Sequence, residues 1–162
     1  MTVSVTERKL DVGDVAPDFS LDSTSGNRIA LSDLRGRKHA LIAFFPLAFT
    51  STCTAEVCDF SVECDAFTGQ GVEVLPISVD SVPTLKEFKR KYDLRVELLS
   101  DFKREASRAY GVLLAERFHS ARAYFLVSSD GVIRWLHIEE NPSQKRSNEE
   151  LLTRIRSLVE EG

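Results

Sequence analysis

The chain has 162 residues, of which 43% are hydrophobic, so it has room for one core of ordinary size. Its 25 acidic and 21 basic residues give a net charge of −4 and are interspersed along the chain. No basic surface for nucleic acid or for a membrane is therefore expected, and the partners should be small molecules or proteins.

The first residues lack the basic start and apolar run of a targeting signal, and no stretch approaches the ~18 apolar residues that a membrane span requires. We therefore expect a cytoplasmic protein. Residues 1–11 show no periodicity and are predicted to form a loose leader. One domain is expected to follow at residues 12–162.

Residues 40–45 form a continuous apolar run, which is typical of a strand that is covered on both faces. We expect short extended segments before this strand, and after it a Pro/Thr/Ser loop that leads into a helix ending near Gly69. Pro76 removes a hydrogen-bond donor from the second central strand, so a bulge or an unpaired side is expected there. The later elements are predicted as a strand at 72–79, a helix that starts at 81–83, a short segment at 96–99, a helix at 104–110, a hairpin at 123–138, and a last helix opened by the capping box Ser147-x-x-Glu150.

Strand–helix–strand units followed by a hairpin and a final helix indicate an α/β sandwich. We expect a central mixed β-sheet flanked by helices.

Three cysteines, Cys53, Cys58 and Cys64, fall within twelve residues of one another. A secreted disulfide scaffold would spread an even number along the chain, so this odd cluster favours reactive chemistry over structural bridges.

Cys53 is predicted on the first turn of the helix, where free backbone N–H groups and the helix dipole favour an anion. A thiol attacks as the thiolate, so this position suits a nucleophile. Thr50 places a hydroxyl three residues before the sulfur, where it can accept from or donate to a substrate oxygen. Pro46 ends the preceding strand.

Helical periodicity assigns different directions to the three cysteines. Cys53 should point inward and Cys58 outward, whereas Cys64 is most simply a small buried hydrophobe. The inward face is predicted to comprise Cys53, Val57, Phe60, Cys64 and Phe67.

Residues five apart on a regular helix have Cα atoms ~8–9 Å apart, beyond the roughly 7 Å limit for a disulfide. A bond between Cys53 and Cys58 therefore requires the first helical turns to unwind. We expect oxidation at Cys53, local opening and capture by Cys58.

The pattern Pro46-x-x-x-Thr50-x-x-Cys53 resembles the active-site motif of the peroxiredoxins, which reduce hydrogen peroxide and organic hydroperoxides without metal or flavin. The resemblance extends over most of the chain. It also includes Val12-Gly13-Asp14-x-Ala16-Pro17-Asp18-Phe19, Leu99-Ser100-Asp101, Ala109-Tyr110-Gly111-Val112, and Arg122-x-x-Phe125-Leu126-Val127 followed by Asp130-Gly131.

This resemblance implies a thioredoxin-like fold, no cofactor, and a peroxidatic role for Cys53. Thr50 and Arg122 would bind the two peroxide oxygens, and Pro46 would shield the site. Glu56 resembles an acidic residue that orients an arginine or the helix start. The simpler alternatives are a turn residue for Thr50, a surface arginine for Arg122 and a solvated acid for Glu56.

Cys58 is similar to the resolving cysteine of the bacterioferritin-comigratory, or Q-type, branch. Residues 45–50, in contrast, look more like the one-cysteine alkyl hydroperoxide reductase E branch. The resemblance therefore implies either a Cys53–Cys58 disulfide or resolution by an external thiol. It further implies a thioredoxin-like or mycoredoxin-like reductant. A monomer or homodimer is expected.

Two other classes of function remain open. A thiol–disulfide oxidoreductase of the thioredoxin type normally uses Cys-x-x-Cys at the helix start, which this sequence lacks. A peroxide sensor would instead relay oxidation from Cys53 to a partner protein. The three histidines have no ligand-like spacing to the cysteines, so no metal site is expected.

Overall fold

A computed structural model of the chain describes residues 9–141 and 143–161. Most of the predicted leader, residues 1–8, lies outside the described residues. Leu10 is buried in the core, and the division of the chain at residue 12 stays a prediction.

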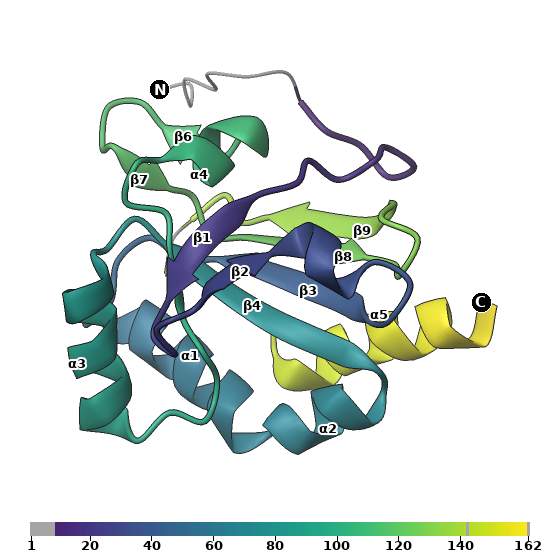
Figure 1. The fold of residues 1–162 in the computed structure, drawn as a ribbon, viewed down its shortest axis with the longest axis horizontal. Coiled ribbons are helices and arrows are strands. Elements are labelled where there is room, and N and C mark those ends of the chain that lie inside the picture. The colour runs from purple at the N-terminus through teal and green to yellow at the C-terminus, as the bar shows by residue number, and fades with distance from the viewer. Residues whose placement is uncertain (1–8, 142, 162) are drawn as a thin grey trace.

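A mixed seven-stranded sheet forms the centre of the molecule, in the order β2-β1-β5-β4-β3-β8-β9 (Figure 1). The predicted central strand is β3, in which every residue after His39 is buried. It pairs parallel with β4 and antiparallel with β8. The strands of this sheet are β1 (Ser20–Ser23), β2 (Arg28–Ala30), β3 (His39–Phe44), β4 (Val72–Ser78), β5 (Leu99–Ser100), β8 (Ala123–Val127) and β9 (Ile133–Ile138).

Pro76 lies inside β4, opposite Ala43 of β3. Neighbouring residues of a strand direct their backbone groups to opposite sides, and the carbonyl of Ile77 accepts from the N–H of Phe45 next to β3. The nitrogen of Pro76 therefore faces β5, whose pairing with β4 begins only at Ile77. The proline thus occupies an unpaired side, as the sequence predicts.

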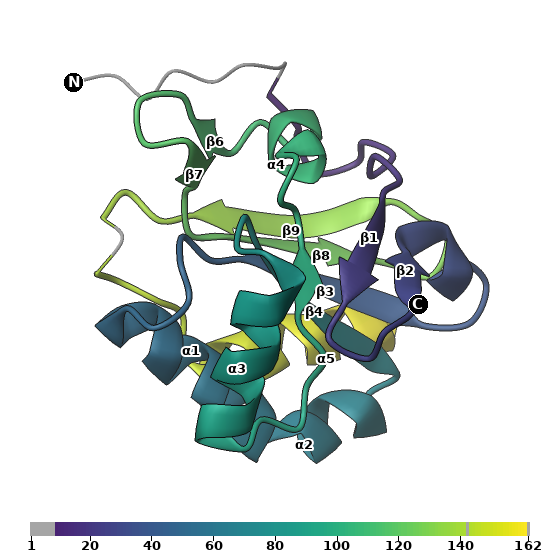
Figure 2. The same ribbon diagram turned by 60° about the vertical axis from the view of Figure 1, so that its left-hand side comes forward.

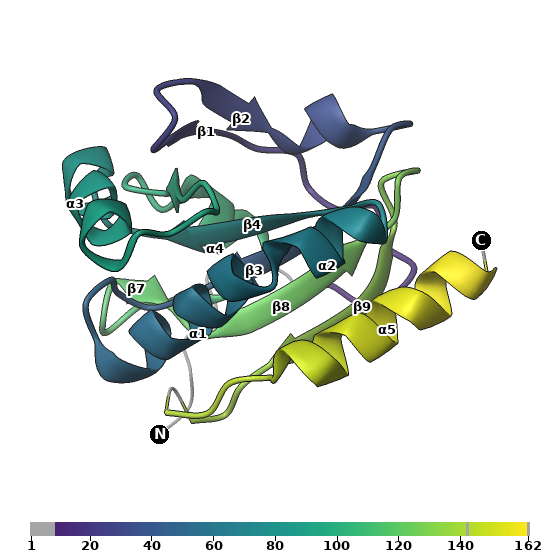
Figure 3. The same ribbon diagram turned by 90° about the horizontal axis from the view of Figure 1, so that it is seen from below.

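Helices cover both faces of the sheet, which confirms the predicted sandwich. Helices α1, α2, α3 and α5 pack against one face, and α4 packs against the other with the N-terminal segment (Figures 2 and 3). The helices are the 3₁₀ turn η1 (Leu31–Leu34), α1 (Ser51–Val62), α2 (Cys64–Gly69), α3 (Val82–Tyr92), α4 (Glu105–Ala109) and α5 (Asn148–Glu161).

The helix predicted to run without interruption to Gly69 is divided at Glu63, where φ is −108° and ψ is 22°. Phe60 and Phe67 on either side of the break still reach the core and pack edge to face at 6.0 Å. Because the break resets the helical phase, Cys64 begins α2 only partly buried. The expectation that Cys64 is a small buried hydrophobe is therefore only partly correct, because Cys64 packs against the core but stays partly exposed.

The predicted hairpin is β8–β9, and the predicted last helix is α5. Ser147 accepts a hydrogen bond from the N–H of Glu150, as a capping residue should. A two-stranded sheet of β6 (Leu113–Leu114) and β7 (His119–Ser120) was not expected from the sequence, because two-residue strands carry no periodicity.

Candidate active site

The active-site candidate lies where β3 ends and the chain turns into α1. Phe49 makes this turn with a φ of 70°, a conformation that residues with a side chain rarely adopt. Its ring packs on Phe88 of α3, with ring centroids 5.0 Å apart. The turn places Ser51 at the start of α1 and Cys53 on the first turn, as predicted.

The sulfur of Cys53 is enclosed within the protein. Cys53 is 1% exposed, which confirms the predicted inward direction. Nη2 of Arg122 donates a hydrogen bond to this sulfur over 3.1 Å. A guanidinium thus contacts a buried sulfur that lies on the first turn of a helix, and both a cation and a helix start favour a thiolate over a thiol.

Strand register explains why Arg122 reaches a residue so distant in sequence. Arg122 precedes β8, and the antiparallel pairing of β8 with β3 places Ala123 opposite Phe44. The start of β8 therefore lies beside the end of β3, where the cysteine loop begins. Arg122 is 2% exposed and is not the surface arginine of the simpler alternative.

Glu56 forms an ion pair with Arg122 through Oε1 and Nη1, and both side chains are 1% exposed. Glu56 is therefore not a solvated acid. Burial raises the pKa of Glu56, although the Arg122 guanidinium and the Tyr124 hydroxyl both act to lower it. Oε2 of Glu56 has no hydrogen-bond partner among the described residues, so the ion pair is the main contact of this carboxyl.

The same burial disfavours the charged form of Arg122, but the neighbouring charges of Glu56 and Cys53 outweigh it and raise the pKa of Arg122. The guanidinium is therefore a permanent cation that contacts two groups, the Cys53 sulfur and the Glu56 carboxyl.

Tyr124, which lies in β8 two residues after Arg122, was not among the site residues predicted from the sequence. Residues two apart in an extended segment point to the same side, so the position of Tyr124 two residues after Arg122 could have indicated that both side chains face the same site.

Thr50 immediately precedes α1, and its hydroxyl donates to the carbonyl of Leu47 over 2.8 Å. The hydroxyl thus uses its proton within the loop and keeps lone pairs for another donor. Thr50 is exposed, whereas Pro46 is buried directly after β3.

Asp80 holds the cysteine loop from the end of the neighbouring strand. Its Oδ2 accepts from the backbone N–H of Ala48 over 2.8 Å and from the Ser78 hydroxyl over 2.7 Å. Asp80 was not among the site residues predicted from the sequence either. The carboxyl ends of parallel strands share one edge of a sheet, so the residues after β4 were candidates to support the loop after β3.

Cys58 lies within the continuous helix α1, and all three cysteines are free. Cys58 is half-buried and packs against the edge of the core, so its predicted outward direction is only partly correct. Burial and the charge of Asp59 raise the pKa of the Cys58 thiol.

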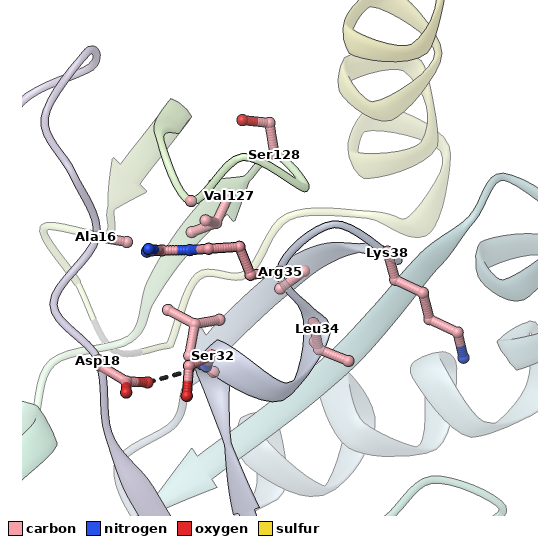
Figure 4. Close-up of a pocket in the computed structure, with 11 residues that line it drawn as sticks. Ala16, Asp18, Ser32, Leu34, Arg35, Lys38, Val127 and Ser128 are labelled. Carbon is pink, nitrogen blue, oxygen red and sulfur yellow. Dashed lines mark hydrogen bonds between the residues drawn. The ribbon is translucent and has the colours of Figure 1, made fainter.

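A small pocket lies at the opposite end of β3, between the N-terminal segment, η1 and the β8–β9 turn (Figure 4). Its lining includes Asp18, Arg35 and Ser128, and it has room for little more than a water molecule. It contains none of the predicted site residues.

Residues 9–141 and 143–161 contain no group of three or more histidine, cysteine, aspartate or glutamate side chains that could hold a metal ion. Within the same residues, none of the helices combines the length and apolar character needed to cross a membrane.

Comparison with known proteins agrees with this geometry. The model of the AhpC/TSA family matches residues 12–136. A putative peroxiredoxin bcp of Coxiella burnetii is 38% identical over 130 residues, which cover 76% of this chain and 85% of that protein. Peroxiredoxin Q of Oryza sativa subsp. japonica is 32% identical over 145 residues, which cover 88% of this chain and 66% of that protein.

Among solved structures, the reduced 2-Cys peroxiredoxin of Plasmodium vivax superposes with a TM-score of 0.86 and 31% identity, covering 92% of this chain and 82% of that one. Family, fold and relatives thus agree with the resemblance found in the sequence. The chain belongs to the AhpC/TSA family, and it is a peroxiredoxin of the bcp or Q type, an enzyme that reduces peroxides with a thiol.

Proposed function

We propose that Cys53 is the peroxidatic residue. Its thiolate attacks one oxygen of hydrogen peroxide or of an organic hydroperoxide and the O–O bond breaks. Cys53 becomes a sulfenic acid, and the other oxygen leaves as water or an alcohol. The observation that carries this proposal is the 3.1 Å hydrogen bond from Arg122 to the buried sulfur at the start of α1.

The neighbouring residues have distinct roles in this proposal. Arg122 stabilises the thiolate and then the charge that develops on the leaving oxygen. Thr50 accepts a hydrogen bond from the peroxide, and Pro46 excludes water from the sulfur. Glu56 acts on the reaction through Arg122, because its ion pair sets the orientation of the guanidinium.

Cys58 is the resolving residue in the same proposal. Its sulfur bonds to that of Cys53, the S–O bond of the sulfenic acid breaks, and the oxygen leaves as water. Both cysteines lie on one regular helix, so α1 must unwind locally before they meet. A thioredoxin-like or mycoredoxin-like protein then reduces the disulfide.

We also propose that the enzyme acts in the cytoplasm, as one domain at residues 12–162 and as a monomer or homodimer, without nucleic-acid or membrane partners. Its formal net charge of −4 with interspersed charges supports the last point.

Mass spectrometry after one equivalent of peroxide tests the two cysteine roles. We expect the wild type to form a Cys53–Cys58 disulfide, Cys53→Ser to lose turnover and Cys58→Ser to accumulate the sulfenic acid. Cys64→Ser is the matched control and should behave as the wild type. Full activity of Cys53→Ser would overturn the peroxidatic assignment. A mixed disulfide with an added thiol, and none with Cys58, would support the one-cysteine mechanism instead.

A further inference from the structure

The second half of α1 is hydrogen-bonded to the segment that joins β9 to α5 and to the start of α5, which lie close to α1 (Figure 3). Nζ of Lys145 lies 2.6 Å from Oδ2 of Asp59. Nδ2 of Asn148 donates to the carbonyl of Asp59 and to Oε1 of Glu63, over 2.8 Å in each case. One side chain of this connection, Lys145, and one of the first residue of α5, Asn148, thus hold the end of α1 that follows Cys58.

Asn148 is buried, with 8% of its surface exposed. Its Oδ1 has no hydrogen-bond partner among the described residues, which is unfavourable for a buried amide. Among the described residues, the buried amide of Asn148 is therefore held by the two hydrogen bonds that its Nδ2 donates to Asp59 and Glu63.

The first half of α1 is held in a different way. Arg122 contacts it through Cys53 and Glu56, and the Cys53 contact stabilises an anionic sulfur. Once the sulfur has become a sulfenic acid and then part of a disulfide, that contact no longer joins two opposite charges and is weaker. The contacts at Asp59 and Glu63 involve no redox-active atom and keep their strength throughout the cycle.

Asp59 marks a boundary in the backbone hydrogen bonds of the helix. Unwinding of residues 51–58 removes the bonds that their carbonyls accept. The carbonyl of Asp59 accepts from the N–H of Glu63 over 3.2 Å and from Asn148, so it is the first along α1 whose bonds survive this change.

We propose that Lys145 and Asn148 are positioning residues for the second step of the reaction. They keep Asp59 and Glu63 in place, so that Cys58, the last residue of the unwinding segment, stays next to the intact part of α1 while Cys53 moves toward it. This inference rests on the proposed resolving role of Cys58.

The positioning matters because it limits how many residues lose order before the two sulfurs meet. Without it, unwinding extends past Cys58 and both reacting groups become mobile, which slows their encounter. A longer-lived sulfenic acid meets a second peroxide and is oxidised to the sulfinic acid. The first step should stay near its wild-type rate, because no hydrogen bond joins either residue to Cys53 and the Lys145 charge is the smallest of the influences on the pKa of Glu56.

The test uses Asn148→Ala and Lys145→Met in the full chain, with acid quenching, alkylation and mass spectrometry after peroxide addition. We expect the rate of Cys53–Cys58 disulfide formation to fall on the order of tenfold and the sulfinic fraction to rise. The rate of the reaction with peroxide should stay that of the wild type. Lys145→Met keeps the experiment informative if Asn148→Ala folds poorly, because Lys145 is only partly buried.

Two matched controls separate positioning from general loss of stability. Ser147→Ala removes the hydrogen bond to the N–H of Glu150 at the same helix start and leaves the contacts with α1. Lys38→Met removes an ion pair with Glu73 elsewhere. Both should form the disulfide at the wild-type rate. Unchanged or faster disulfide formation in the two test variants would overturn the inference. Failure of the wild type to form this disulfide would instead overturn the resolving role of Cys58.

Discussion

The guanidinium of Arg122 lies 3.1 Å from the sulfur of Cys53, although 69 positions separate the two residues in the sequence. The same guanidinium pairs with Glu56 in surroundings that exclude water. One cation is thus shared between a reactive sulfur and a buried carboxyl. Changes to either neighbour should therefore alter both the chemistry and the stability of the site.

Replacing Arg122 by lysine should slow the reaction with peroxide. A lysine keeps the positive charge but cannot present two parallel N–H groups to Cys53 and Glu56. We expect the second-order rate constant for hydrogen peroxide to fall by about 10²-fold, the scale of losing one preorganised donor. Stopped-flow kinetics would measure it. Arg134→Lys, which alters an exposed ion pair with Asp130, is the control and should change nothing. Equal rates for both variants would refute the role of Arg122.

Comparison of the wild type with Glu56→Gln should show how the buried carboxyl of Glu56 makes the free energy of unfolding depend on pH. Burial raises the pKa of Glu56 above its ordinary value of 4.5, so folding favours the protonated form. The associated stability is complete below pH 4.5 and is lost as the pH rises through the folded-state pKa. The free energy of unfolding of the wild type relative to Glu56→Gln should therefore decrease as the pH rises above 4.5. Urea unfolding across this range measures it, and an increase with pH would contradict the prediction.

Disulfide formation should accelerate with pH, because the thiolate of Cys58 is the attacking species in the proposed mechanism. Burial and Asp59 raise the pKa of this thiol above 9.0, so at neutral pH the thiolate is scarce. Below that pKa its fraction grows about tenfold per pH unit. We expect the rate of Cys53–Cys58 bond formation, followed by rapid quenching, to rise accordingly between about pH 7 and about pH 9. A flat profile would mean that unwinding of α1 limits this step.

Asp80→Ala should loosen the cysteine loop without removing any group that contacts the sulfur. The N–H of Ala48 loses its acceptor, and small displacements of a reacting group reduce rates strongly. We expect the rate constant for peroxide to fall about tenfold and Asp80→Asn, which keeps an acceptor oxygen, to restore most of it. Far-UV circular dichroism would confirm that both variants fold. Identical loss in the two variants would argue against loop positioning through this hydrogen bond.

Local patterns in the sequence predicted the elements that depend on neighbouring residues. The apolar run at 40–45 is β3, the Pro/Thr/Ser loop leads to a helix with Cys53 on its first turn, and Ser147 caps the last helix. Each follows from backbone geometry within a few residues, so each can be read without knowledge of the rest of the chain.

The break at Glu63 was not visible in this way. The spacing of Val57, Phe60, Cys64 and Phe67 suits one helix, yet the structure reaches nearly the same burial with two. A pattern of apolar residues records which side chains reach the core, and two arrangements of the backbone can satisfy it. The partial exposure of Cys64 follows from the one that the chain adopts.

The sequence by itself predicted Cys53 as the nucleophile, and it determined the place of Cys53 at a helix start and the α/β architecture. Only the tertiary structure decided what surrounds that sulfur. Arg122 reaches Cys53 through the register of β8 on β3, and Asp80 reaches Ala48 through the shared edge of β3 and β4. The physical reason is that such contacts depend on how distant segments pair and pack, and periodicity within a segment carries no record of its partners.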